Sequence, residues 1–315
     1  MKKIVVFLVA ALISGSLFAA PAAKASKKAA SPKKVNVLVI ESGEYIAGQE
    51  DPYLTANLGK FLEATPEVTK LTALEAAKQA DLAGISYDFL PLYLVEKNEA
   101  VRSKFEEPLQ KGFLLETDKY IILPHQTRTG VYTQRESVPN VMELFVMSQC
   151  PYGVRAEDFI IQAQKDGKLP KDKQIKIRYI VNYDEQRGFA SLHGSGEWEE
   201  DVRQLLIAKY YPEKFWKYLE IRNKDYRSSR WDKAMEDAGI NVKKIMKKFD
   251  TEGLELLKQE AAHVRDYEVS ASPTLIWEGK VVLDFGSAAQ IEGFEFFSPK
   301  NARGGAKAAV PAGSC

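Results

Sequence analysis

A cysteine followed by a proline stands where a predicted strand meets a predicted helix, and this pair is suited to thiol chemistry. The apolar run at residues 141–147 predicts the strand, and apolar residues at helical spacing follow Pro151. Pro151 fits the first turn of a helix, where its missing N–H costs no hydrogen bond. Cys150 is then expected at the helix N-terminus, where unpaired N–H groups and the helix dipole favour a thiolate. We therefore predict that Cys150 is reactive; the alternative is a buried, inert core cysteine.

The chain has one other cysteine, Cys315, so a scaffold stapled by several disulfides is excluded. Residues 298–315 are rich in Gly and Ala and predict a disordered tail. Such a tail is long enough to bring Cys315 to Cys150 at a modest entropic cost. Release of a mixed disulfide on Cys150 needs a second thiol, and the candidates are Cys315, a partner protein and a small external thiol such as glutathione. An incidental or dimer-forming Cys315 is the alternative.

The Cys150 segment resembles the active site of glutaredoxins, and its strand–Cys–helix order resembles the wider thioredoxin superfamily. Cys-Pro-Tyr at 150–152 matches the glutaredoxin sequence, but Gly153 stands where those proteins have a second cysteine. The resemblance implies that Cys150 and Pro151 belong to the catalytic site and that Tyr152 and Gly153 contact the substrate. Because position 153 has no thiol, it also implies chemistry through a single cysteine.

The sequence Ser272-Pro273-Thr274 precedes a short apolar run and resembles the cis-proline loop of the same superfamily. An X–Pro bond is the one place where a cis peptide is accessible at low cost. The resemblance implies that Pro273 lies beside the reactive cysteine in the catalytic site. It also places Ser272, which would pair with the substrate backbone, and Thr274 among the substrate-binding residues. A trans proline at the start of a strand is the alternative.

Residues 191–198, Ser-Leu-His-Gly-Ser-Gly-Glu-Trp, look like the His-Gly-x-x-Glu-Cys signature of gamma-interferon-inducible lysosomal thiol reductase and its bacterial relatives. Together with the two motifs above, this resemblance covers residues 141–297. Trp198 stands where the signature has a cysteine. His193 and Glu197 carry the signature and are candidate site residues, and the alternative for His193 is a helix-start residue with a satisfied hydrogen bond.

The order of predicted strands and helices indicates an α/β protein with tandem thioredoxin-like folds, the second with a helical insertion at about 185–267, as in DsbA-type proteins. We expect a signal peptide at 1–22, a flexible leader at 23–34, a cysteine-free thioredoxin-like domain at 35–125, a linker at 126–140, a thioredoxin-like domain with the Cys150 motif at 141–297, and the disordered tail at 298–315. Residues 71–83 predict a helix. Glu199 and Glu200 are expected on a solvated face of the insertion.

The first residues have the pattern of an export signal. A basic start, Met1-Lys2-Lys3, precedes an apolar run at residues 4–18 and then small residues. The run is too short and too interrupted for a good transmembrane helix. We therefore predict export across the inner membrane to the periplasm, with no membrane contact after signal removal.

Composition excludes several kinds of partner and cofactor. Residues 1–34 carry seven lysines and no acidic residue, so the rest of the chain has a net charge near −6, against +1 for the whole. An acidic body without a basic stripe argues against nucleic acid as a partner. No His/Cys cluster has zinc spacing, and no glycine-rich phosphate-binding motif precedes a helix. We expect no metal and no cofactor.

These features favour a periplasmic thiol–disulfide oxidoreductase that acts through Cys150. Its substrates would be disulfides or thiols of proteins or small molecules, with an external thiol as reductant. The alternative is a redox-inactive thioredoxin-fold module that binds peptides or acts as a chaperone, which the missing thiol at position 153 favours. The pH dependence of Cys150 alkylation discriminates between the two.

Overall fold

The computed structural model describes residues 34–123, 129–298 and 314–315. The predicted signal peptide, the leader up to residue 33 and most of the predicted tail lie outside these residues. No helix among the described residues is long and apolar enough to cross a membrane.

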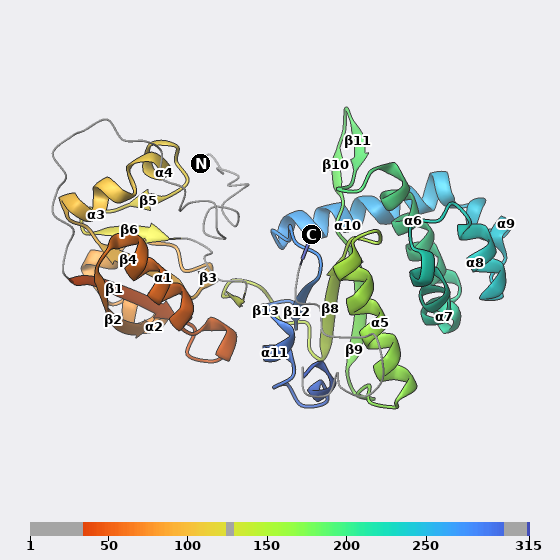
Figure 1. Ribbon diagram of the computed structural model, residues 1–315, viewed down its shortest axis with the longest axis horizontal. Coiled ribbons are helices and arrows are strands. Elements are labelled where there is room, and N and C mark those ends of the chain that lie inside the picture. Colours follow the sequence, from red (N-terminus) through yellow and green to blue (C-terminus); the bar gives the residue numbers. More distant parts are fainter. Residues whose placement is uncertain (1–33, 124–128, 299–313) are drawn as a thin grey trace. The chain divides into compact units, whose positions relative to one another are not determined.

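The chain divides into two compact units, each described here by itself (Figure 1). The first unit comprises Met1–Glu136 together with Lys280–Val282. The second comprises Ser137–Gly279 and Leu283–Cys315. Both cysteines and all motifs singled out in the sequence therefore belong to the second unit.

The first unit is built on a five-stranded sheet with the order β2-β1-β4-β6-β5. Its strands are β1 (Lys34–Glu41), β2 (Thr65–Thr72), β4 (Leu92–Glu96), β5 (Leu115–Glu116) and β6 (Tyr120–Leu123). β1 runs parallel to β2 and antiparallel to β4. The connection from β1 to β2 is α1 (Pro52–Leu62), which begins after Asp51, whose carboxylate accepts a hydrogen bond from the Tyr53 N–H. α1 buries Leu54 and Leu58 in the core on one face of the sheet.

The remaining elements of the first unit correct two expectations. They are η1 (Ile46–Gly48), α2 (Ala73–Ala76), η2 (Ala80–Leu82), β3 (Phe89–Leu90), α3 (Glu99–Lys104), α4 (Glu106–Gln110) and β7 (Gly130–Tyr132). The predicted helix at 71–83 is replaced by the end of β2, the short helix α2 and the 3-10 helix η2. β2 is a largely exposed edge strand that pairs with β1, so it lacks the alternating buried apolar residues that indicate a strand. β7 lies inside the predicted linker at 126–140.

The second unit opens with a strand, a helix and a parallel strand: β8 (Val141–Val146), α5 (Pro151–Lys165) and β9 (Gln174–Tyr179). Every residue of β8 is buried, as in a central strand covered on both faces. β12 (Thr274–Trp277) pairs antiparallel with β8, with Thr274 opposite Phe145. Because of this register, the residues that precede β12 lie beside the turn that follows β8. The register thus brings two motifs together that are more than a hundred residues apart.

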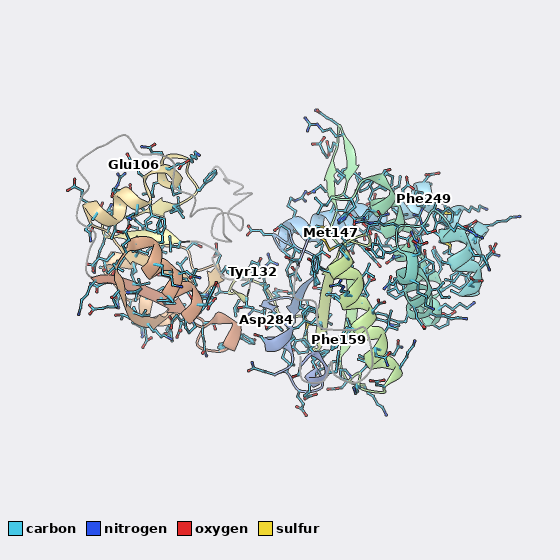
Figure 2. All side chains as sticks on the ribbon, viewed as in Figure 1. Glu106, Tyr132, Met147, Phe159, Phe249 and Asp284 are labelled. Carbon is cyan, nitrogen blue, oxygen red and sulfur yellow. A yellow bond between two sulfur atoms is a disulfide. The ribbon has the colours of Figure 1, made fainter. Side chains whose placement is uncertain are left out.

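After β12 the chain forms β13 (Val281–Leu283), of which residues 281 and 282 belong to the first unit, and the second unit ends with α11 (Phe285–Ala288) and η5 (Glu295–Phe297). Between β9 and β12 the chain forms the insertion: β10 (Asn182–Asp184), β11 (Gly188–Ala190), α6 (Ser195–Tyr210), α7 (Pro212–Arg222), η3 (Asn223–Asp225), α8 (Trp231–Asp237), α9 (Val242–Met246), η4 (Phe249–Gly253) and α10 (Leu254–Asp266). The helices share one apolar core that includes Leu206, Leu219 and Phe249. Phe249 lies among the helices of the insertion (Figure 2). The predicted helical insertion is thus present, but the sequence did not indicate the β10–β11 hairpin at its start, in which Phe189 packs against Trp198.

Candidate functional site

The two cysteines of the chain form a disulfide with each other. The Cys150 and Cys315 sulfurs are 2.05 Å apart and their Cα atoms 6.2 Å apart, across a sequence separation of 165 residues. The chain end that carries Cys315 lies beside the start of α5 (Figure 1). Cys150 is the residue immediately before α5 and is fully buried, whereas Cys315 is partly exposed. Of the three thiols considered as partners for Cys150, the structure therefore places Cys315 in contact with it.

Cys315 is also held through its main chain. Its N–H donates a hydrogen bond to the Ser272 carbonyl at 3.0 Å, and its carbonyl accepts one from the Ser272 N–H at 3.4 Å. The Ser272 carbonyl lies 3.6 Å from the Cys150 sulfur. Ser272 thus contacts both partners of the disulfide.

Gly153 has no room for a side chain. A Cβ atom at this position would lie 2.5 Å from the Ser272 Oγ and 3.2 Å from the Met147 carbonyl oxygen. The Ser272 hydroxyl is fixed there because it accepts a hydrogen bond of 2.9 Å from the Met147 N–H. The hydroxyl therefore fills the space into which a cysteine at position 153 would extend its side chain.

The other predicted site residues surround this disulfide. Pro151 is the first residue of α5, and Tyr152 in the same turn is partly exposed with the Arg155 guanidinium 5.7 Å from its ring centre. The Ser272–Pro273 peptide bond is cis. Thr274 begins β12 and donates a hydrogen bond of 2.7 Å to the carbonyl of residue 271. The structure thus brings residues 150–153 and 272–274 into one place.

Glu197 connects the signature segment to the turn that carries Cys150. The buried carboxylate accepts a hydrogen bond of 2.9 Å from the Gln149 N–H and one of 2.8 Å from the His193 Nδ1. It also accepts a bond of 3.2 Å from the His193 N–H, and the Glu197 carbonyl accepts one of 3.2 Å from the Ser148 hydroxyl. His193 itself is hydrogen-bonded to Glu197. Glu197 is therefore the residue of this pair that fixes the Cys150 turn.

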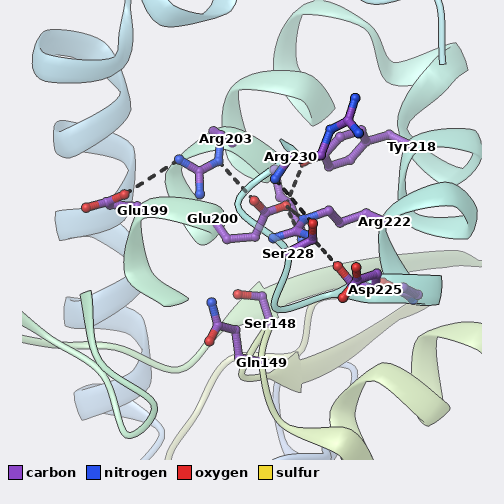
Figure 3. A network of polar contacts seen from close by, with 12 residues as sticks. Ser148, Gln149, Glu199, Glu200, Arg203, Tyr218, Arg222, Asp225, Ser228 and Arg230 are labelled. Atoms are coloured by element: carbon purple, nitrogen blue, oxygen red, sulfur yellow. Dashed lines mark hydrogen bonds and ion pairs between the residues drawn. The ribbon is translucent and has the colours of Figure 1, made fainter. Parts of the chain in front are cut away.

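A buried polar network lies next to this turn (Figure 3). The Glu200 carboxylate accepts hydrogen bonds from Arg203 Nε at 2.9 Å and from the Tyr218 hydroxyl at 2.7 Å, and Arg222 Nε lies 3.3 Å from it. The expectation that Glu200 lies on a solvated face is therefore wrong. One signal could have indicated this: Glu197, Glu200 and Gln204 repeat at helical spacing and so share one face of α6.

Two further buried carboxyls beside this network have raised pKa values. Burial raises the pKa of Glu157 to about 8, a hydrogen bond from Asn223 opposes the shift, and the charges of Asp158 and Glu200 add to it. Burial likewise raises the pKa of Asp201 well above its ordinary value. With a pKa of about 8, the Glu157 carboxyl keeps its proton at neutral pH.

The described residues hold no cluster of three or more His, Cys, Asp or Glu side chains that is arranged for a metal ion. The groups at the site that can take part in chemistry are its two sulfur atoms and the surrounding acids. A disulfide at a helix N-terminus can exchange with external thiols, because the helix end stabilises the thiolate that leaves.

Comparisons with known proteins give structural likenesses only. No family model matches the sequence, and no curated protein matches it. Among solved structures, the chain is similar to the DsbA disulfide interchange protein of Klebsiella pneumoniae, with 16% identity over 54% of this chain and 88% of that one and a TM-score of 0.36. BdbD of Bacillus subtilis is similar at 17% identity over 51% of this chain and 86% of that one, with a TM-score of 0.38.

A DsbA variant from Proteus mirabilis, solved with a non-covalently bound peptide, is similar at 12% identity over 56% of this chain and 92% of that one, with a TM-score of 0.37. The matched structures are DsbA-like disulfide oxidoreductases with a thioredoxin fold. At these identities and TM-scores we carry no residue role over from them.

Proposed function

We propose that this protein is a thiol–disulfide oxidoreductase whose redox couple is Cys150 and Cys315. The observation that carries the proposal is the disulfide between these residues at the N-terminus of α5. In the oxidising direction, a substrate thiolate attacks one sulfur of the pair, forms a mixed disulfide and releases the other sulfur as a thiolate. A second substrate thiol then displaces the first sulfur. The substrate leaves as a disulfide, and the two electrons remain on Cys150 and Cys315 as a dithiol.

In this proposal Cys315 takes the role that a cysteine at position 153 has in the resembled proteins. The lack of room at position 153 supports this role, because the Ser272 hydroxyl lies where a side chain of residue 153 would begin. Cys315 reaches Cys150 from beside the backbone of Ser272, to which it is hydrogen-bonded. The single-cysteine mechanism expected from the sequence thus becomes a two-cysteine mechanism.

The other residues have supporting roles. The N-terminus of α5, with Pro151 in its first turn, stabilises the Cys150 thiolate. Glu197 positions the turn before Cys150 through the Gln149 N–H, and His193 orients that carboxylate. Tyr152 is the partly exposed residue of this turn that an incoming substrate meets. Neither a metal nor a cofactor takes part.

We further propose that both units are thioredoxin-like domains and that the protein works outside the cytoplasm, in the periplasm. The leader pattern of residues 1–22 supports export, and a disulfide persists in such an oxidising compartment. In the first unit, the β1–α1–β2 crossover and the antiparallel β4 support the tandem arrangement. Substrates are thiols or disulfides of proteins or small molecules.

The test is the reduction potential of the Cys150–Cys315 pair. The protein is equilibrated in glutathione or dithiothreitol buffers, quenched with acid and labelled with a maleimide that shifts its electrophoretic mobility. A midpoint between about −270 and −120 mV is expected for an exchanging couple. Reduction of insulin disulfides by the protein should depend on Cys150, with Cys150→Ser as the inactive variant.

One observation favours a second function, a redox-inactive peptide-binding or chaperone module: Cys150 is fully buried in the disulfide state. In that case the disulfide is a structural staple. A midpoint below about −300 mV would identify such a bond. The same conclusion would be supported if the wild type and Cys150→Ser both reduced insulin only at the background rate.

A further inference from the structure

Both hydrogen-bonding groups of the Ser272 main chain are engaged by Cys315. The N–H and the carbonyl of Ser272 bond to the carbonyl and the N–H of the same residue, at 3.4 and 3.0 Å. This reciprocal arrangement is the hydrogen-bonded pair of an antiparallel β-ladder. Cys315 therefore lies against Ser272 as an added strand does, and not only as the end of a disulfide.

The main chain of Ser272 has no partner in the neighbouring strand of the sheet. Ser272 lies two residues before β12, beyond the pairing of Thr274 with Phe145, so β8 does not supply partners for its main chain. Ser272 is fully buried when Cys315 is present. When Cys315 leaves, a polar N–H and carbonyl at the bottom of the site need new partners, either water or another extended chain. An extended peptide supplies both groups at once.

We propose that this backbone edge is one binding site with two alternating occupants. In the disulfide state, residues 314–315 of the chain occupy it and exclude peptides. In the dithiol state, an external extended peptide takes their place. The switch between the two occupants rests on the proposed function, because it needs the disulfide to be reduced. The competition between them does not, because both would bond to the same N–H and carbonyl of Ser272.

The disulfide strongly favours Cys315 over a free peptide in the competition for the Ser272 main chain. While Cys315 is bonded to Cys150, its main chain is tethered beside Ser272 and a peptide in solution has to displace a tethered competitor. Reduction leaves two main-chain hydrogen bonds, which are individually weak in water. Peptide binding should therefore be at least about tenfold tighter to the reduced protein than to the oxidised protein.

The probe is a fluorescent synthetic peptide with the sequence of residues 308–315 and serine in place of Cys315, so that it cannot form a disulfide. Its fluorescence anisotropy is followed with oxidised wild-type protein, with the same protein reduced by a phosphine, and with Cys150→Ser. We expect tighter binding to the reduced protein and to Cys150→Ser. Cys150→Ser also controls for the reductant, because its peptide affinity should not respond to the phosphine. Equal affinity of the oxidised and reduced wild type would overturn the proposal.

Hydrogen exchange of the Ser272 amide locates the binding. This amide should be protected in the oxidised protein, exchange faster after reduction, and be protected again by the peptide. Protection that persists after reduction without peptide, or peptide binding that leaves this amide unprotected, would contradict the shared site. These measurements use chemically reduced protein. They can therefore succeed even if the potential of the pair shows that the disulfide is structural, and they can fail while the pair still exchanges.

Discussion

Replacement of the buried Glu157 by glutamine should change the pH dependence of stability in a defined way. The carboxyl is buried in α5, and burial raises its pKa from 4.5 to about 8. The folded protein therefore keeps this proton up to about pH 8, whereas the unfolded chain releases it near pH 4.5. Between these values the unfolded state binds fewer protons than the folded state, so the stability of the wild type falls as pH rises. Glutamine resembles the protonated carboxyl in shape and does not titrate.

The magnitude follows from the shift. Each pH unit inside the window costs the wild type about 1.4 kcal/mol relative to the variant. Glu157→Gln should thus gain on the order of 3 kcal/mol relative to the wild type between pH 5 and pH 7.5. Below pH 4.5 and above about pH 8, the difference between the two proteins should be constant.

The assay is urea unfolding followed by tryptophan fluorescence from pH 4 to 9. All four tryptophans, Trp198, Trp216, Trp231 and Trp277, lie in the second unit, so the signal reports that unit. Both proteins are kept in the disulfide state. The exposed Glu236 on α8 provides the matched control, because Glu236→Gln makes the same substitution in a helix without a buried carboxyl. A constant difference between Glu157→Gln and the wild type from pH 5 to pH 8 would refute the reasoning.

Three further predictions concern the site. Gly153→Ala should lower the free energy of unfolding by roughly 1–3 kcal/mol, because its Cβ meets the Ser272 hydroxyl at 2.5 Å, and Ser272→Ala should recover part of this loss in a double-mutant cycle measured by urea unfolding. After brief exposure to glutathione and rapid alkylation, mass spectrometry should find glutathione on the partly exposed Cys315, since Cys150 is fully buried; a dominant adduct on Cys150 would show the opposite order of attack. Glu197→Ala should lower the melting temperature of the second unit by several degrees, because it leaves the partly buried Gln149 N–H without its acceptor; an unchanged melting curve would contradict the positioning role.

Much of the local structure around the site is predictable from the sequence. The apolar run at residues 141–147, the Pro151 start of α5 and the helical spacing in the insertion each depend on neighbours within a few residues. The predictions failed where partners far away in sequence decide. β2 is strand only because it pairs with β1. Glu200 is buried only because Arg203, Arg222 and Tyr218 surround its carboxylate.

The sequence by itself determined that Cys150 sits at the start of a helix, since Cys-Pro after an apolar run admits little else. It also placed Ser272-Pro273 directly before a strand. Only the tertiary structure decided that these two motifs meet, because the antiparallel register of β12 on β8 aligns their ends. Only it decided that Cys315, and not an external thiol, is the partner of Cys150. The reason is spatial: the main chain of Ser272, beside Cys150, pairs with Cys315 through two hydrogen bonds.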